Sequence, residues 1–494
     1  MSGRRESGWA VGGASVRGRR RLAGRGLAQV CRVWAPGAAD LMRVVPSTGA
    51  TLAAVVAARA RRRPHDPVWV DDRGELTAGA LWLAIAARVP SAGGTVVVHT
   101  GDQRLALITV VAEQAAGGRA VVVPVRAGRA ALAAARGRYP GAWCVTDQDP
   151  APPMMPDPPG GRAGPGRWRR AGGTLVFATS GTTGPARSIA HAAGLGAAAQ
   201  MLGALGAFPP LRRPLVASAA AIDHGHGFGL LAATLVLGGT FVALPPGPAD
   251  AAALLADRGR PVDLLSGVPR QLADLAELPP ATWAGTPVRR VLSGSDRLDA
   301  ATAAAVTGAL TPELYNAYGA TETGTVCVAT PRDLAEAPGT VGRPVTGVLV
   351  RVVDEVGMPV AAGEDGRLEI RSPLSGPQVF TGDRGRIDRD GRVHVLGRAD
   401  GAVVTGGETV DPGILRRALL ATPGVLAAEV TLAPDRRFGA RLVADVTVAS
   451  AGPVDVDQWR RRLRRDLGPA LTPREIQVHP AGGPGGGAAG GDRR

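Results

Sequence analysis

The run Leu175-Val176-Phe177-Ala178-Thr179-Ser180-Gly181-Thr182-Thr183-Gly184 is the most informative stretch of this sequence. Its first half is apolar and rich in strand-forming residues, which predicts a buried strand. Its second half combines glycines, which let the backbone approach a ligand, with hydroxyls and N–H groups that can donate to anionic oxygens. Arg187 adds a cation nearby. No Gly-Lys-Ser/Thr ends the run, so it is not a Walker A loop. A phosphate-binding loop and an ordinary turn are both open at this point.

The composition is that of a large globular protein. The chain has 494 residues, 45% of them apolar, which allows a sizeable core. Its three cysteines, Cys31, Cys144 and Cys327, are far apart, so they predict neither a disulfide framework nor a metal knuckle. No apolar run of about eighteen residues and no secretion signal is present. We therefore expect a cytoplasmic protein without a membrane span.

The positive charge is concentrated at the start of the chain. Residues 1–63 carry thirteen arginines against Glu6 and Asp40, which is +11 of the total net charge of +15. This distribution favours a solvated, disordered leader, which we place at residues 1–50, over an arm that binds nucleic acid or an anionic membrane. We expect no nucleic-acid partner. Met42 is an alternative start, and retained activity after truncation there would make the leader dispensable.

The chain contains no lysine, so all 57 of its basic residues are arginine. A strongly GC-biased genome explains this composition. It has a chemical consequence, because arginine does not replace lysine freely.

Apolar patterning alternates between strands and helices from residue 51 onward. Helices are expected at 52–63, 78–89, 104–116, 194–205, 229–236 and 251–258, and strands at 68–70, 95–98, 120–124, 215–217, 240–244, 264–268, 290–292 and 313–315. Alternation of this kind predicts parallel sheets covered by helices. A Pro/Gly-rich surface linker or long loop is expected at 149–173.

The pattern of the sequence changes after about residue 338, from alternating strands and helices to short strands. Short β segments at 348–353, 368–370 and 393–396 are separated by Asp-Gly turns. A last α+β portion begins near residue 400, and residues 481–494 form a Gly-rich tail. The expected fold is therefore α/β, with a large N-terminal domain of parallel-sheet subdomains plus a β-rich subdomain at 51–398. A small α+β C-terminal domain at 399–480 completes it.

Four motifs stand in a fixed order along the chain. They are the loop 179–184, Asn316-Ala-Tyr318-Gly319-Ala-Thr321-Glu322, Thr381-Gly382-Asp383, and Gly397-Arg398-Ala-Asp400 followed by Thr405-Gly406-Gly407-Glu408. Together they resemble the adenylate-forming superfamily, which contains acyl-CoA and aryl-CoA synthetases, luciferases and peptide-synthetase adenylation domains. The resemblance covers about residues 50–480. The segment 402–407 is also similar to o-succinylbenzoate-CoA ligases over a short overlap.

The resemblance implies that the chain binds ATP and Mg²⁺, activates a carboxylic acid as an acyl adenylate, and passes the acyl group to a thiol. The residues that match the family's nucleotide site are Thr179, Ser180, Gly181, Thr182, Thr183, Gly184, Gly294, Asn316, Tyr318, Gly319, Thr321, Asp383 and Arg398. Tyr318 matches the aromatic that packs on adenine, and Asp383 the carboxylate that receives the ribose hydroxyls. Glu322 matches the magnesium ligand. Thr179, Glu322, Arg187 and His226 are the implied catalytic residues.

Two further segments match parts of the family. His226-Gly-Phe-Gly corresponds to the mouth of the acid pocket, whereas a metal site at His224-x-His226 lacks a third ligand cluster. Asp400 matches the hinge before a mobile C-terminal domain, and Gly406 and Gly407 match the loop used in the thiol step. The implied acceptor is coenzyme A or the phosphopantetheine of a separate carrier protein.

The sequence departs from the family in its basic residues. Arg187 stands where lysine is usual, Ala186 where proline is usual, and Val404 where many relatives have lysine. The C-terminal lysine that bridges carboxylate and α-phosphate is absent after His479-Pro480. The hypotheses are therefore an acid:thiol ligase for a fatty or aryl acid, and a degenerate member that binds nucleotide or acyl adenylate with little adenylation activity.

Overall fold

The structure is a computed structural model. It describes residues 27–28, 30, 51–89, 93–148, 173–179, 187–192, 195–375, 379–398, 403–405, 408–435, 439–449 and 454–481. Several expectations therefore lie outside the described residues. These are most of the leader, the linker at 149–172, the loop residues 180–184, the hinge residue Asp400, the glycines Gly406 and Gly407, and the tail from 482.

The first sheet carries the strand that precedes the Gly/Thr-rich loop. Its order is β5-β3-β4-β6-β7, with β3, β4, β5 and β6 parallel and β7 antiparallel to β6. The strands are β3 (Thr95–His99), β4 (Arg119–Val122), β5 (Trp143–Thr146), β6 (Thr174–Thr179) and β7 (Arg187–Ala192). Helix α6 (Gly128–Arg138) covers one face, through contacts of Ala135 with Val97, Val121 and Val176.

The second sheet has nine strands in the order β14-β13-β12-β11-β10-β8-β9-β1-β2. They are β1 (Pro67–Asp71), β2 (Gly74–Thr77), β8 (Leu215–Ser218), β9 (Thr240–Ala243), β10 (Leu264–Gly267), β11 (Val291–Gly294), β12 (Leu314–Ala320), β13 (Gly324–Ala329) and β14 (Arg343–Pro344). Neighbouring strands from β12 to β1 in this order are parallel, and the outer pairs are antiparallel.

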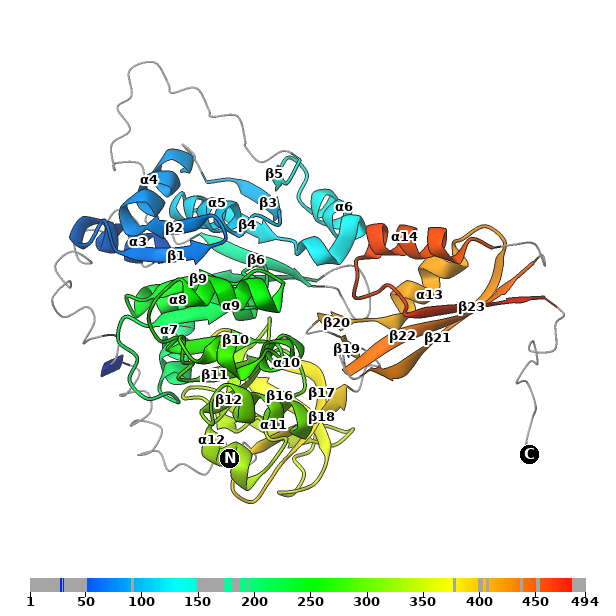
Figure 1. Cartoon of the computed structure of the whole chain (residues 1–494). Coiled ribbons are helices and arrows are strands. Elements are labelled where there is room, and N and C mark those ends of the chain that lie inside the picture. The colour runs from blue at the N-terminus through cyan, green and yellow to red at the C-terminus, as the bar shows by residue number, and fades with distance from the viewer. Residues whose placement is uncertain are drawn as a thin grey trace, which may run out of the picture.

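A layer of helices shares one core with both sheets (Figure 1). It consists of α3 (Leu52–Arg62), α4 (Ala78–Arg88), α5 (Gln103–Ala115) and α8 (Gly225–Val236). The first helix is tied to the second sheet, because Arg59 Nη1 donates to the carbonyl of Gly239 at 2.6 Å. Other helices cover the opposite face of the second sheet, namely α9 (Pro248–Ala256), α10 (Pro269–Ala276) and α11 (Ala300–Ala309).

A third, antiparallel sheet packs with α7 (Leu195–Leu205) against β12 and β13. It is formed by β15 (Leu349–Val353), β16 (Gly366–Arg371), β17 (Val379–Ile387) and β18 (Val393–Arg398). Helix α12 (Pro331–Glu336) precedes it, and its Asp333 accepts hydrogen bonds from Arg343 and Arg392. These ion pairs join the third sheet to the second.

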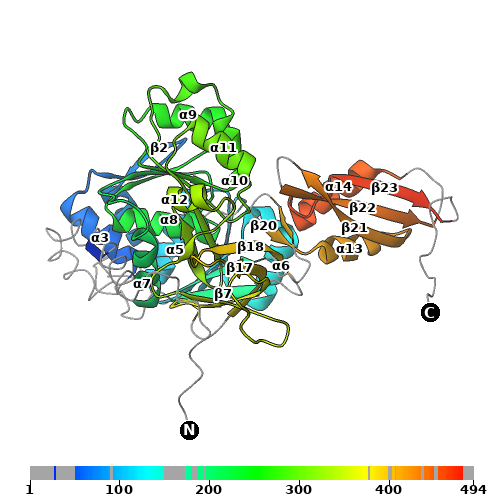
Figure 2. The same cartoon turned by 90° about the horizontal axis from the view of Figure 1, so that it is seen from below.

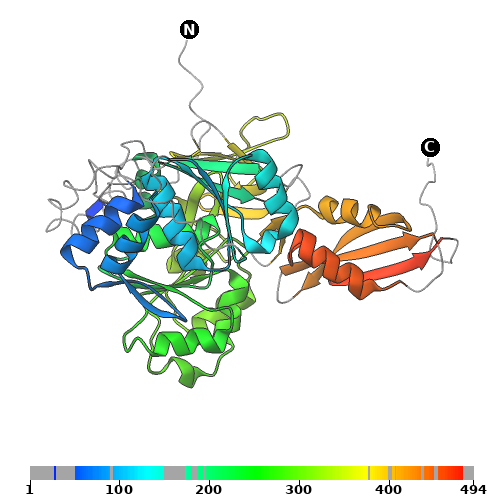
Figure 3. The ribbon, with the colours of Figure 1, turned by 90° about the horizontal axis from the view of Figure 1, so that it is seen from above.

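The C-terminal part is a separate α+β unit (Figures 2 and 3). Its three-stranded sheet of β21 (Val425–Asp435), β22 (Gly439–Val448) and β23 (Glu475–Pro480) packs with α13 (Pro412–Leu420) and α14 (Val456–Leu467). The hairpin of β19 (Val403–Thr405) and β20 (Glu408–Val410) precedes this unit. Helix α14 contacts α6 of the N-terminal region.

The predicted α/β class is confirmed, including the parallel sheets, the β-rich third sheet and the α+β C-terminal unit. Thr77 caps the helix α4, which was predicted at 78–89, since its side chain accepts a hydrogen bond from Ala80 N. The predicted start of a helix at Gly229 is wrong, because α8 begins at Gly225. Glycines weaken the helical signal there. Gly227 is needed because a Cβ would lie 2.1 Å from the carbonyl oxygen of Ala221. None of the helices in the described ranges is long and apolar enough to cross a membrane.

Candidate active site

One large cleft contains most of the predicted site residues that the structure describes. Its volume is about 1670 Å³, and it lies beside the carboxyl ends of β11 and β12. Ligands of parallel α/β sheets commonly bind at such strand ends. The cleft is bounded by α7 and α8, the third sheet and part of the C-terminal unit.

Three polar side chains from three strands meet on one side of the cleft. Tyr318 on β12 donates its hydroxyl hydrogen to Asp383 Oδ2 at 2.5 Å. Arg398 Nη1 donates to Asp383 Oδ1 at 3.4 Å, because Asp383 and Arg398 are direct partners in the β17–β18 register. Burial, followed by the negative charge of Asp383, raises the pKa of Tyr318 well above its usual value. The tyrosine therefore stays protonated and acts as a donor to the carboxylate.

The next motif residues lie at the tip of a hairpin between β12 and β13. Thr323 N donates to the carbonyl of Ala320 at 3.1 Å, which makes Thr321 and Glu322 the central residues of a tight turn. Gly324 follows with a φ of +66°, a left-handed conformation that favours glycine. Both Thr321 and Glu322 line the cleft and are half-buried.

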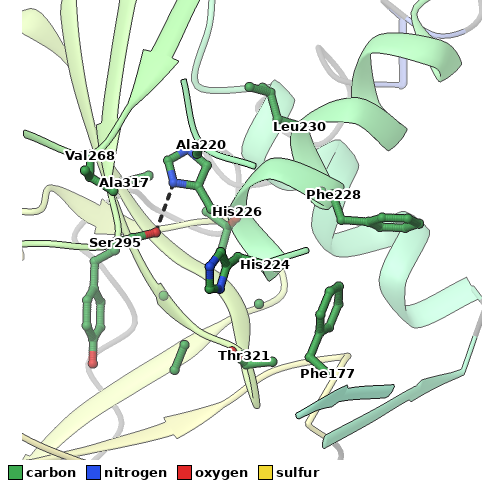
Figure 4. Close-up of a pocket in the computed structure, with 18 of the residues that line it drawn as sticks. Phe177, Ala220, His224, His226, Phe228, Leu230, Val268, Ser295, Ala317 and Thr321 are labelled. Atoms are coloured by element: carbon green, nitrogen blue, oxygen red, sulfur yellow. Dashed lines mark hydrogen bonds between the residues drawn. The ribbon is translucent and has the colours of Figure 1, made fainter. Parts of the chain in front are cut away.

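His226 lies in a more apolar lobe of the same cleft, shown in Figure 4. Its Nε2 is 2.9 Å from Ser266 Oγ, and its Nδ1 is 3.0 Å from Ser295 Oγ. Ser266 uses its own hydrogen to donate to the carbonyl of Leu292 at 3.0 Å. It must therefore accept from His226 Nε2–H, which leaves His226 Nδ1 to accept from the hydroxyl of Ser295. Desolvation by burial and then the nearby His224 lower the pKa of His226 to about 4.

Gly294 and Asn316 lie beside these groups on adjacent strands. A Cβ on Gly294 would come within 3.1 Å of His226 Cε1, so a side chain here would crowd the imidazole. Asn316 Nδ2 donates to the carbonyl of Thr340 at 3.3 Å, whereas its buried Oδ1 has no hydrogen-bond partner among the described residues. Gly319 is also confined, since a Cβ would lie 2.2 Å from the carbonyl oxygen of Gly324.

The structure gives only the backbone on either side of the Gly/Thr-rich loop. Thr179 is the last residue of β6 and Arg187 the first of β7, and the two are paired in the antiparallel register. The loop residues Ser180, Gly181, Thr182, Thr183 and Gly184 lie outside the described residues. So do Asp400, Gly406 and Gly407, although Val403 and Val410 of the flanking hairpin line the cleft.

Comparison with known proteins identifies this arrangement. Residues 173–382 match the family model of the AMP-binding enzyme. Residues 173–382 therefore correspond to an AMP-binding domain. The predicted resemblance is thereby confirmed.

Sequence relatives match parts of the chain. Sulfoacetate–CoA ligase of Cupriavidus necator is 31% identical in an alignment over 199 residues that covers 34% of this chain and 39% of the relative. An uncharacterized acyl-CoA ligase of Bacillus subtilis, YhfT, is 30% identical in an alignment over 239 residues that covers 46% of this chain and 48% of the relative. The matched regions thus span less than half the length of either relative.

Solved structures share the fold over most of the chain. Amide bond synthetase McbA from Marinactinospora thermotolerans superposes with a TM-score of 0.75 at 22% identity. The superposition covers 87% of this chain and 95% of that protein, so the fold similarity extends well beyond the AMP-binding domain.

A magnesium ion could be held in this cleft by Glu322 together with the phosphates of a nucleotide. Among the residues whose placement is described, no group of three or more His, Cys, Asp or Glu side chains could hold a metal ion. Magnesium commonly uses one or two protein carboxylates plus phosphate oxygens and water. Glu322, at the tip of its hairpin, can supply one such carboxylate.

Sequence reasoning missed three polar residues of the AMP-binding domain. Ser266 and Ser295 position His226, and Gln200 on α7 donates to the hairpin that carries Glu322. Ser295 has a φ of +65°, which is unusual for a residue with a side chain. The sequence signal for Gln200 was available, because it is the one polar side chain in the otherwise apolar helix α7.

Proposed function

We propose that this chain activates a carboxylic acid with ATP to form an acyl adenylate, and then transfers the acyl group to the thiol of coenzyme A or of a carrier protein. One observation carries the proposal. The Tyr318–Asp383–Arg398 cluster, the hairpin bearing Glu322 and the lobe around His226 all open into one cleft of an AMP-binding domain. The CoA ligase names of the two sequence relatives support the same reaction class.

In the first step, a carboxylate oxygen attacks the α-phosphorus of ATP and pyrophosphate leaves with the electrons of the broken bond. Asp383 is suited to accept hydrogen bonds from the ribose hydroxyls, while Arg398 and Tyr318 hold the carboxylate in place. The loop 180–184 and Arg187 would neutralise phosphate charge. Magnesium held by Glu322 and the phosphates would supply further neutralisation.

In the second step, a thiolate attacks the acyl carbonyl carbon and AMP leaves. We assign this step to the C-terminal unit, with Asp400 as the hinge and Gly406 and Gly407 as the loop that leaves room for a pantetheine arm. The proposed domain bounds are 51–398 and 399–480. The hairpin β19–β20 supports this assignment, because its Val403 and Val410 already line the cleft.

The lobe around His226 favours a fatty or aryl acid. Phe177 and Phe228 make an edge-to-face ring contact with centroids 6.1 Å apart, and Leu230 and Val268 also line the lobe (Figure 4). Because His226 is neutral at physiological pH, it offers no positive charge for a second anionic group of the acid. An o-succinylbenzoate-like substrate is the alternative, and its second carboxylate would need a cation other than His226.

The missing lysine supports a second candidate function. Without a cation bridging carboxylate and α-phosphate, transition-state stabilisation would fall by about a few kcal/mol, which is several orders of magnitude in rate at worst. A chain with that deficit would bind nucleotide or acyl adenylate and adenylate poorly. The thiol step does not use this lysine and would survive.

Acid-dependent release of pyrophosphate from ATP separates the two functions. The full chain should be tested with a panel of fatty, aryl and amino acids. Release with at least one acid supports the ligase, and Glu322→Gln should then suppress it while the protein stays folded. Measurable ATP binding without release for any acid would instead favour the degenerate binding protein.

A further inference from the structure

Gln200 is a buried polar residue that contacts the hairpin of the nucleotide site without belonging to any of its motifs. It is 4% exposed, and its helix α7 packs on β13. Its Nε2 donates to the carbonyl of Thr323 at 2.6 Å and to that of Thr325 at 2.8 Å. Because both neighbours are acceptors, the amide nitrogen must face them, which fixes the orientation of the carboxamide.

These two hydrogen bonds hold the base of the turn that carries Glu322. Thr323 closes this turn through its backbone N–H, and its Oγ1 accepts from Ala320 N at 3.2 Å. Gly324 lies between the two carbonyl groups, and a Cβ there would be 3.0 Å from Gln200 Nε2. Fixing Thr323 and Thr325 therefore limits the positions that Thr321 and Glu322 can take.

The same carboxamide is poorly placed for stability alone. Its Oε1 is buried and has no hydrogen-bond partner within the part of the chain that the structure describes. A buried acceptor left without a partner opposes folding, and an apolar side chain of similar shape would remove that penalty. A glutamine at this position is therefore better explained by the hydrogen bonds through which its amide nitrogen fixes the hairpin.

We propose that Gln200 is a positioning residue, which fixes the β12–β13 hairpin so that Glu322 can bind the magnesium ion accompanying ATP. The inference rests on the proposed function, because it assigns Glu322 to that ion. It adds a residue of α7 that lines the cleft, and this residue acts through the backbone of the hairpin.

The test is calorimetric binding of α,β-methylene-ATP, a non-hydrolysable analogue, to the full chain in the presence of Mg²⁺ and in EDTA. Gln200→Met keeps the length of the side chain and removes both donors. We expect it to weaken binding with Mg²⁺ about tenfold, which corresponds to about 1.4 kcal/mol, and to change binding in EDTA little. Gln200→Asn, which shortens the carboxamide by one methylene, should behave alike, and Glu322→Gln should show the same selective loss.

Thr234→Val is the matched control. Thr234 is a buried residue of α8 whose Oγ1 donates to the carbonyl of Leu230 at 2.7 Å, outside the cleft lining. It should lower the melting temperature and leave both affinities unchanged. Equal losses with Mg²⁺ and in EDTA for Gln200→Met, or no loss, would overturn the inference alone. If the unmodified chain shows no magnesium-dependent binding, the proposed function fails together with it.

Discussion

At the scale of single residues, the cleft contains two kinds of polar group. Asp383 accepts hydrogen bonds from Tyr318 and Arg398. His226 is held neutral between two serine hydroxyls, in a position where burial opposes a positive charge. The Tyr318–Asp383–Arg398 cluster thus contains charged groups, whereas burial favours the neutral form of His226.

His226 should make stability depend on pH. Its pKa in the folded protein is lowered from 6.5 to about 4, chiefly by burial. Between these pH values the unfolded chain binds a proton at His226 that the folded protein does not. The free energy of unfolding is therefore not reduced by His226 above about pH 6.5, and it decreases as the pH falls toward 4. Urea unfolding at pH 7 and pH 5 measures it. His226→Gln should lose less stability between the two pH values than the unmodified chain.

The exposed His65 provides the control for this experiment. His65→Gln should keep the pH dependence of the unmodified chain. An identical slope for His226→Gln would show that the imidazole of His226 is protonated as readily in the folded protein as in the unfolded one.

Tyr318→Phe should weaken nucleotide binding. The change keeps the ring and removes the O–H donor to Asp383, and a hydrogen bond to a charged group contributes about 1.5–3 kcal/mol. If Asp383 binds the ribose throughout the reaction, as proposed, KM for ATP should rise about tenfold or more with little change in kcat. Steady-state pyrophosphate release measures both. Tyr315→Phe, which loses a bond to Glu313 at 3.2 Å outside the cleft, should leave KM unchanged.

At the scale of elements, strand ends and hairpin tips carry the site. The apolar runs predicted β6, β11 and part of β12 correctly, because buried parallel strands have continuous apolar sequences. The sequence did not predict β13, although it is the antiparallel partner that turns Thr321 and Glu322 into a hairpin tip. Its register depends on a left-handed Gly324 and on Gln200, which lies more than a hundred residues earlier.

In the candidate site, too, local motifs could be predicted and contacts between distant residues could not. Asp383 and Arg398 were predicted from their motifs, and their direct pairing follows from the β17–β18 register. The serines around His226 could not be predicted, because Ser266 and Ser295 reach it from the ends of two different strands. Long-range register and burial decide such contacts, and a local sequence pattern reports neither.

Gly324→Ala should destabilise the protein by more than the cost of its left-handed backbone conformation alone. A left-handed conformation costs a residue with a side chain about 1–2 kcal/mol. Gly357 has a similar φ of +84°, and no other atom lies within 4 Å of the place where a methyl group would stand, so Gly357→Ala reports that cost by itself. At Gly324 the methyl group would also crowd Gln200 and Leu374 at 3.0 Å. Chemical denaturation should rank Gly324→Ala as the less stable variant, and equal losses would argue against the crowding.

At the scale of the whole molecule, two glycines bring the C-terminal unit against α6. Gly468 follows α14 and lies against the carbonyl of Arg126, while Gly128 begins α6 and lies against the backbone of Gly468. Asp466 adds an electrostatic attraction to Arg129, and both its neighbour Arg465 and Arg129 lower the pKa of the Asp466 carboxyl. The contact is close because neither glycine has a side chain.

Gly468→Ala should separate α14 from α6. Its methyl group would lie 1.7 Å from the carbonyl oxygen of Arg126, a backbone atom that cannot rotate away. We expect thioester formation to fall about tenfold or more if the lost contact is worth at least about 1.4 kcal/mol, with acid-dependent pyrophosphate release retained. Gly424→Ala, at a φ of +85° with nothing nearby, is the control and should keep both activities. Loss of both activities in Gly468→Ala would contradict a role confined to the thiol step.

The position of β1 between β2 and β9 has a consequence for synthesis on the ribosome. The helix α3 and strand β1 are made early, yet Trp69 and Val70 pair with Phe241 and Val242, and Arg59 bonds to Gly239. The apolar residues Val56, Val68 and Trp69 therefore stay without part of their final core until about residue 243 has emerged. Contacts so distant along the chain form slowly and leave apolar surface exposed meanwhile. The nascent N-terminal region is thus the segment most in need of protection from aggregation.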